Sequence, residues 1–239
     1  MKGKKATKEA FTELAPRYEE TVDDELQTFW GWSYQGFVDN LIQQTPIKPG
    51  DKILDIATGT AVIPRHIMKR AENPEFRIFG LDITESMLAH GKQKIDPDHF
   101  GSVISLTCGD AMALPFDEDS FDVIITGLAS HHIDIPLMLK EIKRVLKRGG
   151  TLSMIDVGAS YLWRLPLVKG VLRMAAFMYF LLKENFSRAW AEAAAVTNVW
   201  TLEKWNRELL SLGFKDVKIR KIPSKNKWIP DPLAIYVSS

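Results

Sequence analysis

Between residues 51 and 158, short apolar segments alternate with longer segments of helical periodicity. The apolar segments are rich in Ile, Val and Leu and are predicted to be strands, at 51–57, 76–83, 103–110, 121–129 and 151–158. Helices are predicted between them at 60–72, 84–95 and 135–148. Strands joined by helices of this length lie parallel in one sheet, and the helices cover both of its faces. The pattern therefore predicts an α/β fold.

The regions on either side of this alternation are predicted to add a cap, a lid and the last part of the sheet. Residues 7–20 and 23–45 have the spacing of helices, and Pro16 is expected to kink the first of them. The end of the chain predicts one helix and two strands, at 201–213, 214–222 and 232–239.

We therefore expect a seven-stranded, mostly parallel sheet flanked by helices, with a helical cap. The chain is predicted to begin with an N-terminal helical cap (1–45), followed by an α/β core (46–158). A helical lid insertion (159–200) comes next, and a C-terminal helix with strands (201–239) completes the sheet.

Composition and charge exclude several classes of protein. Apolar residues make up 46% and charged residues 26% of the 239 residues, which excludes a disordered or fibrous chain. With 31 basic and 30 acidic residues, the chain has no global attraction for nucleic acid, and no nucleic-acid partner is expected. Cys108 is the single cysteine, expected to be a buried structural thiol. A chain with one cysteine and no apolar secretory signal is expected to be cytoplasmic.

Acidic residues and glycines stand where the predicted strands end. Asp55 lies near the end of the first strand and Gly59 just after it, while Asp82, Asp110 and Gly127 lie at or near the ends of the second, third and fourth strands. Ligands of an open parallel sheet bind beyond the carboxyl ends of its strands. An acid there can accept hydrogen bonds from ribose hydroxyls or an exocyclic amine, and a glycine lets the backbone approach a ligand. The alternative for each acid is that it caps the next helix.

These stretches resemble the class I S-adenosylmethionine-dependent methyltransferases, in the ubiquinone/menaquinone-biosynthesis branch (methyltransferase type 11). The similar segments are ILDIATGTA, GLDITESML, GDAMALPFDEDSFDVI, LKEIKRVLKRGGTLSMID and, near the start, FTELAPRYEE. The resemblance covers residues 10–158 together with LLSLGFKDVKI and PLAIYVSS near the end. It implies a Rossmann-like methyltransferase fold and S-adenosyl-L-methionine as the cofactor.

The resemblance also implies roles for individual residues. Asp55 would organise the first loop and reach the amino group of the methionine portion, Asp82 would bind the ribose, and Asp110 the adenine. The other implied cofactor-binding residues are Tyr18 at the carboxylate end, Ala57, Thr58 and Gly59 beside the methionine portion, Ile83 and Met87 against the adenine or sugar, Ala111 and Met112 at the adenine, and Gly127 through its carbonyl. One departure is Ala61, which stands where the family's motif has its last glycine.

His131 and His132 are the candidate catalytic residues. They follow the fourth strand on the side where a substrate would lie, and a neutral imidazole can take a proton from a phenol or an enol. The alternative is that they cap the turn or pack under the lid, and the sequence favours neither histidine over the other. The spacing of His, Cys, Asp and Glu resembles no metal site, so no metal is expected.

Residues 161–182 are strongly apolar, but basic residues interrupt them, so a membrane span is not predicted. Three interpretations stay open. The segment is a lid helix packed on the core, an amphipathic helix on a membrane surface, or a lid whose inner face lines an apolar substrate pocket with Met174, Met178 and Tyr179.

The predicted function is transfer of a methyl group to a hydrophobic or aromatic small molecule, such as a quinone or isoprenoid precursor or a secondary metabolite. Tryptophans concentrate in the cap and lid, among them Trp30 and Trp163, and large aromatic side chains favour an apolar acceptor. Two alternatives remain: an isomerase or cyclase that binds the same cofactor, and a non-catalytic interaction protein on the same fold. Peripheral contact with a membrane and the oligomeric state are left open.

Overall fold

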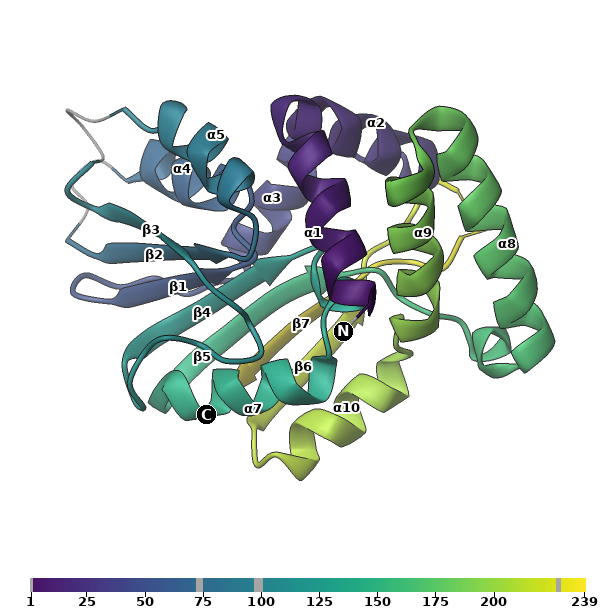
Figure 1. Ribbon diagram of the computed structural model, residues 1–239. Helices are drawn as coiled ribbons and strands as arrows, with labels where there is room; N and C mark the ends of the chain where they lie inside the picture. Colours follow the sequence, from purple (N-terminus) through teal and green to yellow (C-terminus); the bar gives the residue numbers. More distant parts are fainter. Residues whose placement is uncertain (1, 72–74, 97–100, 227–228) are drawn as a thin grey trace.

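The computed structural model describes residues 2–71, 75–96, 101–226 and 229–239, and contains one seven-stranded sheet (Figure 1). The strands are β1 (Lys52–Ile56), β2 (Arg77–Asp82), β3 (Ile104–Cys108), β4 (Phe121–Gly127), β5 (Leu146–Asp156), β6 (Lys215–Lys221) and β7 (Leu233–Ser238). Their order is β3-β2-β1-β4-β5-β7-β6, and β7 runs antiparallel to both of its neighbours. The predicted seven-stranded, mostly parallel sheet is confirmed.

The central strands are buried because helices cover both faces of the sheet. On one face, α3 (Tyr34–Gln43) and α4 (Val62–Arg70) pack their apolar side chains against β1, β2 and β4. On the other face, α7 (Ile135–Val145) and α10 (Leu202–Ser211) pack against β4, β5 and β7. A further helix of the core, α5 (Glu85–Gln93), follows β2. Strands covered on both faces have continuous apolar runs, as at residues 123–125 of β4.

The N-terminal region folds into α1 (Lys2–Leu14), a short 3₁₀ turn (Ala15–Arg17) and α2 (Tyr18–Trp30). The break predicted at Pro16 is confirmed, since Pro16 lies in the 3₁₀ turn. The prediction of one helix over 23–45 is wrong, because α2 ends at Trp30 and α3 begins at Tyr34. Gly31 ends α2 in the left-handed conformation (φ +69°), which favours glycine. Ser33 then caps α3, because its side chain accepts a hydrogen bond from the Gly36 amide.

The fifth strand is longer than predicted. The helix predicted to reach residue 148 ends at Val145, and β5 begins at Leu146 rather than at residue 151. Leu146 is buried in the core and pairs with Phe121, and the register then shifts before Val123 pairs with Thr151. Packing of Leu146 therefore overrides the helical pattern of the segment.

Residues 161–198 form the insertion, as η3 (Tyr161–Arg164), α8 (Pro166–Lys183), α9 (Phe186–Ala195) and η4 (Val196–Asn198). Figure 1 shows α8 and α9 side by side, with α1 between α9 and the sheet. Among the described residues, none of the helices combines the length and the apolar character that crossing a bilayer requires.

Leu139 of α7 is fully buried between the helix and the sheet, whereas its neighbour Lys140 is exposed. We expect Leu139→Ala to lower the free energy of unfolding by about 2–5 kcal/mol, because it leaves a cavity in the core. Lys140→Ala should change it by no more than about 0.5 kcal/mol. Urea denaturation of both variants measures the difference, and equal stabilities would contradict this account of the core.

Candidate functional site at the carboxyl ends of the strands

Asp55 is the penultimate residue of β1 and is fully buried. The Thr58 hydroxyl donates to Asp55 Oδ2 at 2.6 Å, while Oδ1 is buried and has no hydrogen-bond partner in the described part of the chain. Burial, with Asp82 nearby as a second negative charge, raises the pKa of Asp55 to about 8. The site thus contains a buried carboxyl oxygen whose capacity to accept a hydrogen bond is not used by any residue described.

The loop after β1 passes close to its neighbours in an unusual backbone conformation. Ala57, Gly59 and Ala61 all have φ near +57°, a region that favours glycine. The Gly59 amide donates to Asp82 Oδ2 at 2.9 Å, and a Cβ at Gly59 would lie 3.5 Å from the ring of Tyr18. Ala61, which replaces a glycine of the family's motif, is fully buried. The fold therefore accommodates its methyl group.

Asp82 connects two loops through its carboxylate. Oδ2 accepts from the Gly59 amide and Oδ1 from the Thr84 amide at 2.8 Å. Burial raises the pKa of Asp82, although both backbone hydrogen bonds oppose the rise. Asp82 thus has a structural role at the start of α5 in addition to any ligand contact.

Asp110 lies beyond β3 and is partly exposed. Its Oδ2 forms an ion pair with Lys4 Nζ at 2.5 Å, and its Oδ1 accepts from the Met112 amide at 3.0 Å. Although burial alone would raise the pKa of Asp110, these contacts lower it below its usual value. Cys108, expected to be buried, is exposed, because the end of the edge strand β3 is not covered at that position.

The sheet order brings the predicted residues together. Because β3, β2, β1 and β4 are neighbours, the residues that follow them line one edge of the sheet (Figure 1). Gly127 ends β4 against α3, where a Cβ would meet Phe37 at 3.1 Å. The remaining predicted positions lie in the loops and helices after these strands: Ala57, Thr58, Ile83, Met87, Ala111 and Met112. Tyr18 reaches the same edge from α2.

An apolar cavity of about 530 Å³ lies beside these strand ends. Helices of the cap and of the insertion provide most of its wall, with Trp30 from α2 and Trp163 from η3 among the lining residues. Of the described residues, Tyr18 both lines the cavity and covers Gly59, whereas Asp55 and Asp82 lie outside the lining. Tyr18 therefore stands between the strand-end acids and the cavity, and burial raises its pKa to about 12.

The insertion lines this cavity with one side of α8. Leu172, Ala176 and Tyr179 face the cavity. Of the three side chains named in the pocket-lining interpretation of this segment, Tyr179 lines the cavity, whereas Met174 and Met178, which are 63% and 45% exposed, do not. Their helical phase places them away from the inner face.

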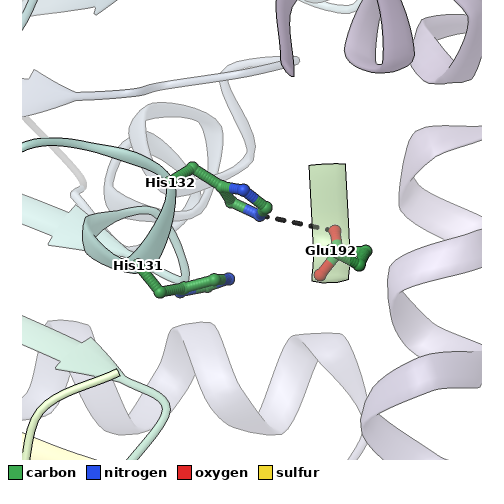
Figure 2. Close-up of side chains that lie close together, drawn as sticks. All are labelled: His131, His132 and Glu192. Atoms are coloured by element: carbon green, nitrogen blue, oxygen red, sulfur yellow. Dashed lines mark ion pairs between the residues drawn. The ribbon is translucent and has the colours of Figure 1, made fainter. Parts of the chain in front are cut away.

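The polar end of the cavity is formed by His131, His132 and Glu192. Figure 2 shows the two imidazoles from the turn after β4 and the carboxylate from α9 pointing toward one another. His132 Nε2 lies 3.4 Å from Glu192 Oε1, and His131 Nδ1 lies 2.6 Å from Asp156 Oδ1. Arg188, also on α9, places Nη2 3.1 Å from Glu192 Oε1.

The two histidines have opposite electrostatic environments. Although burial opposes it, Asp156 raises the pKa of His131, and the pKa of Asp156 is correspondingly lowered. Burial lowers the pKa of His132, and the partial compensation by Glu192 does not reverse this. Burial opposes ionisation of Glu192 as well, but Arg188 and then His132 hold its pKa well below the usual range. The charged form is therefore more favoured at His131 than at His132.

Both histidines are predicted from the sequence, but Asp156, Arg188 and Glu192 are not. The available signal for the last two was a pair of opposite charges at i and i+4 in the alanine-rich segment 186–195. Sequence spacing also predicted no metal site, yet ligand atoms of His131, His132 and Glu192 lie within 4.8 Å of one another. The guanidinium of Arg188 on Glu192 opposes a second cation at this position.

Comparisons with known proteins relate the whole arrangement to one family. A model of the ubiE/COQ5 methyltransferase family matches residues 3–180. The demethylmenaquinone methyltransferase of Symbiobacterium thermophilum is 32% identical over 151 residues, 62% of this chain and 59% of that protein. The demethylmenaquinone methyltransferase of Bacillus subtilis is 38% identical over 135 residues, 56% of this chain and 54% of that protein. The chain thus spans less than two thirds of the length of either relative.

The fold has solved counterparts. The geranyl diphosphate C-methyltransferase of Streptomyces coelicolor A3(2), in complex with Mg²⁺, geranyl diphosphate and S-adenosyl-L-homocysteine, matches with a TM-score of 0.67. The match covers 92% of this chain and 83% of that one at 13% identity, so it shows a shared Rossmann-like fold. With the strand order, the loop after β1 and the family model in agreement, the chain belongs to the ubiE/COQ5 methyltransferase family.

Proposed function

We propose that this protein transfers the methyl group of S-adenosyl-L-methionine to a hydrophobic or aromatic small molecule. The observation that carries the proposal is an apolar cavity of about 530 Å³ that shares Tyr18 with the loop at the strand ends. One side chain thereby adjoins both the predicted cofactor site and a space suited to an apolar acceptor. The names of the relatives, demethylmenaquinone methyltransferases, support a quinone-type acceptor.

The residues at the strand ends fit the proposed cofactor. Asp55 Oδ1, buried and without a hydrogen-bond partner among the residues described, suits a ligand ammonium group. Gly59 would lie beside the methionine portion. Asp82 and Asp110 would accept from the ribose and the adenine in addition to the hydrogen bonds that they already receive from backbone amides. The other residues proposed to contact the cofactor are Ala57, Thr58, Ile83, Met87, Ala111, Met112 and Gly127.

When bound, the cofactor supplies a methyl group that its positively charged sulfur has already activated. The protein has to hold the acceptor in line with that group and to exclude water. Tyr18 and the aromatic wall of the cavity orient the acceptor, while the cap and the insertion close over it. The polar end, with His131 and His132, is where an acceptor proton can be received.

The function is tested by incubating the protein with S-adenosyl-L-methionine and a panel of quinols, phenols and amines. Mass spectrometry should detect a methylated product together with S-adenosylhomocysteine. Conversion of a substrate without formation of S-adenosylhomocysteine would instead indicate an isomerase or cyclase. Failure to bind S-adenosylhomocysteine in calorimetry would favour a non-catalytic scaffold.

Asp82→Ala is expected to weaken S-adenosylhomocysteine binding by about 2–3 kcal/mol, because buried charge-assisted hydrogen bonds are lost. Titration calorimetry measures the change, and a thermal melt verifies that the variant is folded. Asp24→Ala, an exposed acid on α2, is the matched control and should bind as the unmodified protein does. Unchanged affinity of Asp82→Ala would remove Asp82 from the ribose role.

Binding should also depend on pH through Asp55. With a pKa of about 8, the buried carboxyl is protonated below that pH and must lose its proton to pair with an ammonium group. Affinity for S-adenosylhomocysteine should therefore rise between pH 6 and 8, by at most about tenfold per pH unit. Asp55→Asn should flatten this rise in calorimetric titrations. An equally steep rise in the variant would assign the proton to another group.

We also propose that the outer face of α8 rests on a lipid surface. Leu167, Val171, Met174 and Leu182 are 80%, 61%, 63% and 83% exposed on this helix. Its basic residues Lys169, Arg173 and Lys183 complement anionic headgroups. The opposite side of α8 lines the cavity, so one helix would adjoin both the lipid and the proposed substrate space.

Flotation with vesicles of phosphatidylglycerol and phosphatidylcholine tests this contact. Val171→Asp should lower vesicle binding at least severalfold, because a charge on an interfacial apolar face opposes insertion. Leu210→Asp is the control, since Leu210 is a 54% exposed leucine on α10. Equal binding of both variants would contradict the proposal. A dimer in solution that Val171→Asp dissociates would instead assign the face to a second copy.

A further inference from the structure

We propose that His132 receives the proton lost by the methyl acceptor, and that Glu192 of α9 is the residue that orients His132 for this step. The inference rests on the methyltransferase function proposed above and deepens it by distinguishing the two adjacent histidines. It also gives the insertion a role in the chemistry, because Glu192 belongs to that segment.

His131 is already engaged by a buried carboxylate. Its Nδ1 lies 2.6 Å from Asp156 Oδ1, while Asp156 Oδ2 accepts from both the amide and the hydroxyl of Ser130. Asp156 is 2% exposed, so this pair holds the turn after β4 in place. Nδ1 of His131 is thus committed to Asp156, and this contact gives His131 a structural role in the turn.

His132 has the arrangement that a proton acceptor needs. Its Nε2 faces Glu192 Oε1 at 3.4 Å, and a neutral imidazole carries its hydrogen on the nitrogen nearest an ionised carboxylate. The lone pair is then on Nδ1, a buried atom that lacks a hydrogen-bond partner within the described structure. His132 lines the apolar cavity, and the ring of Phe11 on α1 packs edge-on against it at 5.2 Å.

Arg188 keeps Glu192 ionised and in place. Its Nη2 lies 3.1 Å from Glu192 Oε1 and 3.1 Å from Glu25 Oε2, so the guanidinium links α9 to α2. The groups that face His132 are thus Glu192 and Arg188 from α9, His131 from its own turn, and Phe11 from α1. Glu192 also balances the charge when His132 becomes an imidazolium, because its own carboxylate stays negative.

The separation of 3.4 Å between His132 Nε2 and Glu192 Oε1 is long for a hydrogen bond, and the two groups form an ion pair only once His132 is protonated. Hydrogen bonds of catalytic groups are often long before substrate binds and shorten in the complex. In the overall balance, the acceptor forms a bond to the methyl carbon and loses one hydrogen as a proton. The bond between the methyl carbon and the sulfur of S-adenosyl-L-methionine breaks, and its electron pair remains with the sulfur. The proton passes to Nδ1 of His132 and later to water.

The tautomer can be read without any substrate. The chain has five histidines, so ¹⁵N–¹H correlation spectra of ¹⁵N-histidine-labelled protein can be assigned with His131→Gln and His132→Gln. We expect His132 to carry its hydrogen on Nε2, with a hydrogen-free Nδ1, at neutral pH. Glu192→Gln should shift the titration of His132 to lower pH, because the carboxylate that stabilises the imidazolium is gone. A hydrogen on Nδ1, or an unmoved titration, would overturn the proposal.

Kinetics of the full-length chain separate orientation from simple packing. The probe acceptor is a 2-prenyl-1,4-naphthoquinol generated with dithionite. His132→Gln should lower kcat by about 10²–10⁴-fold, the usual contribution of a general base. Glu192→Gln should lower kcat about tenfold or more with KM unchanged, and should shift the rising limb of the pH profile to lower pH.

Controls distinguish this inference from the proposed function. Glu203→Gln, on the exposed start of α10, should leave kcat and the pH profile unchanged, and Glu192→Asp should recover part of the loss. If the unmodified protein neither binds S-adenosylhomocysteine nor forms product, the proposed function fails while the spectra still report the tautomer. If product forms and Glu192→Gln has an unchanged pH profile, the role of Glu192 is overturned.

Discussion

The hydrogen bond from the Gly59 amide to the Asp82 carboxylate joins the loop after β1 to the end of β2. The loop has positive φ at Ala57, Gly59 and Ala61, and the carboxylate is buried at the strand end. Asp82 in turn receives the Thr84 amide and so directs the start of α5. Both strand ends, the loop and the helix are therefore held in one arrangement, which Tyr18 covers from α2.

This arrangement removes two carboxyl groups from water, which is energetically unfavourable. Asp55 and Asp82 both have raised pKa values because burial disfavours their charged forms. Backbone hydrogen bonds partly stabilise the buried carboxylate of Asp82. In contrast, one oxygen of Asp55 has no hydrogen bond in the residues described. Destabilised groups of this kind are typical of sites that a ligand completes.

The apolar cavity also contains buried charged groups, but these groups pair with one another. Its wall is built from aromatic and aliphatic side chains, yet Arg188, Glu192 and Glu25 are brought into it as a linked set of charges. Each charge has an opposite partner, which is what makes its burial tolerable. Because α9 carries two of them, the insertion contributes polar chemistry as well as an apolar lid.

Sequence alone determined the strands, the helices between them and the acids at the strand ends, because local periodicity and residue type decide these features. It placed Asp55, Asp82 and His132 correctly at strand ends or in the turn that follows. The sequence did not predict the features that depend on packing between distant segments. These are the position of Leu146 in a strand, the outward orientation of Met174, and the contact of Glu192 with His132. Residues 60 positions apart meet only through the packing of α9 on the turn after β4, which no local pattern encodes.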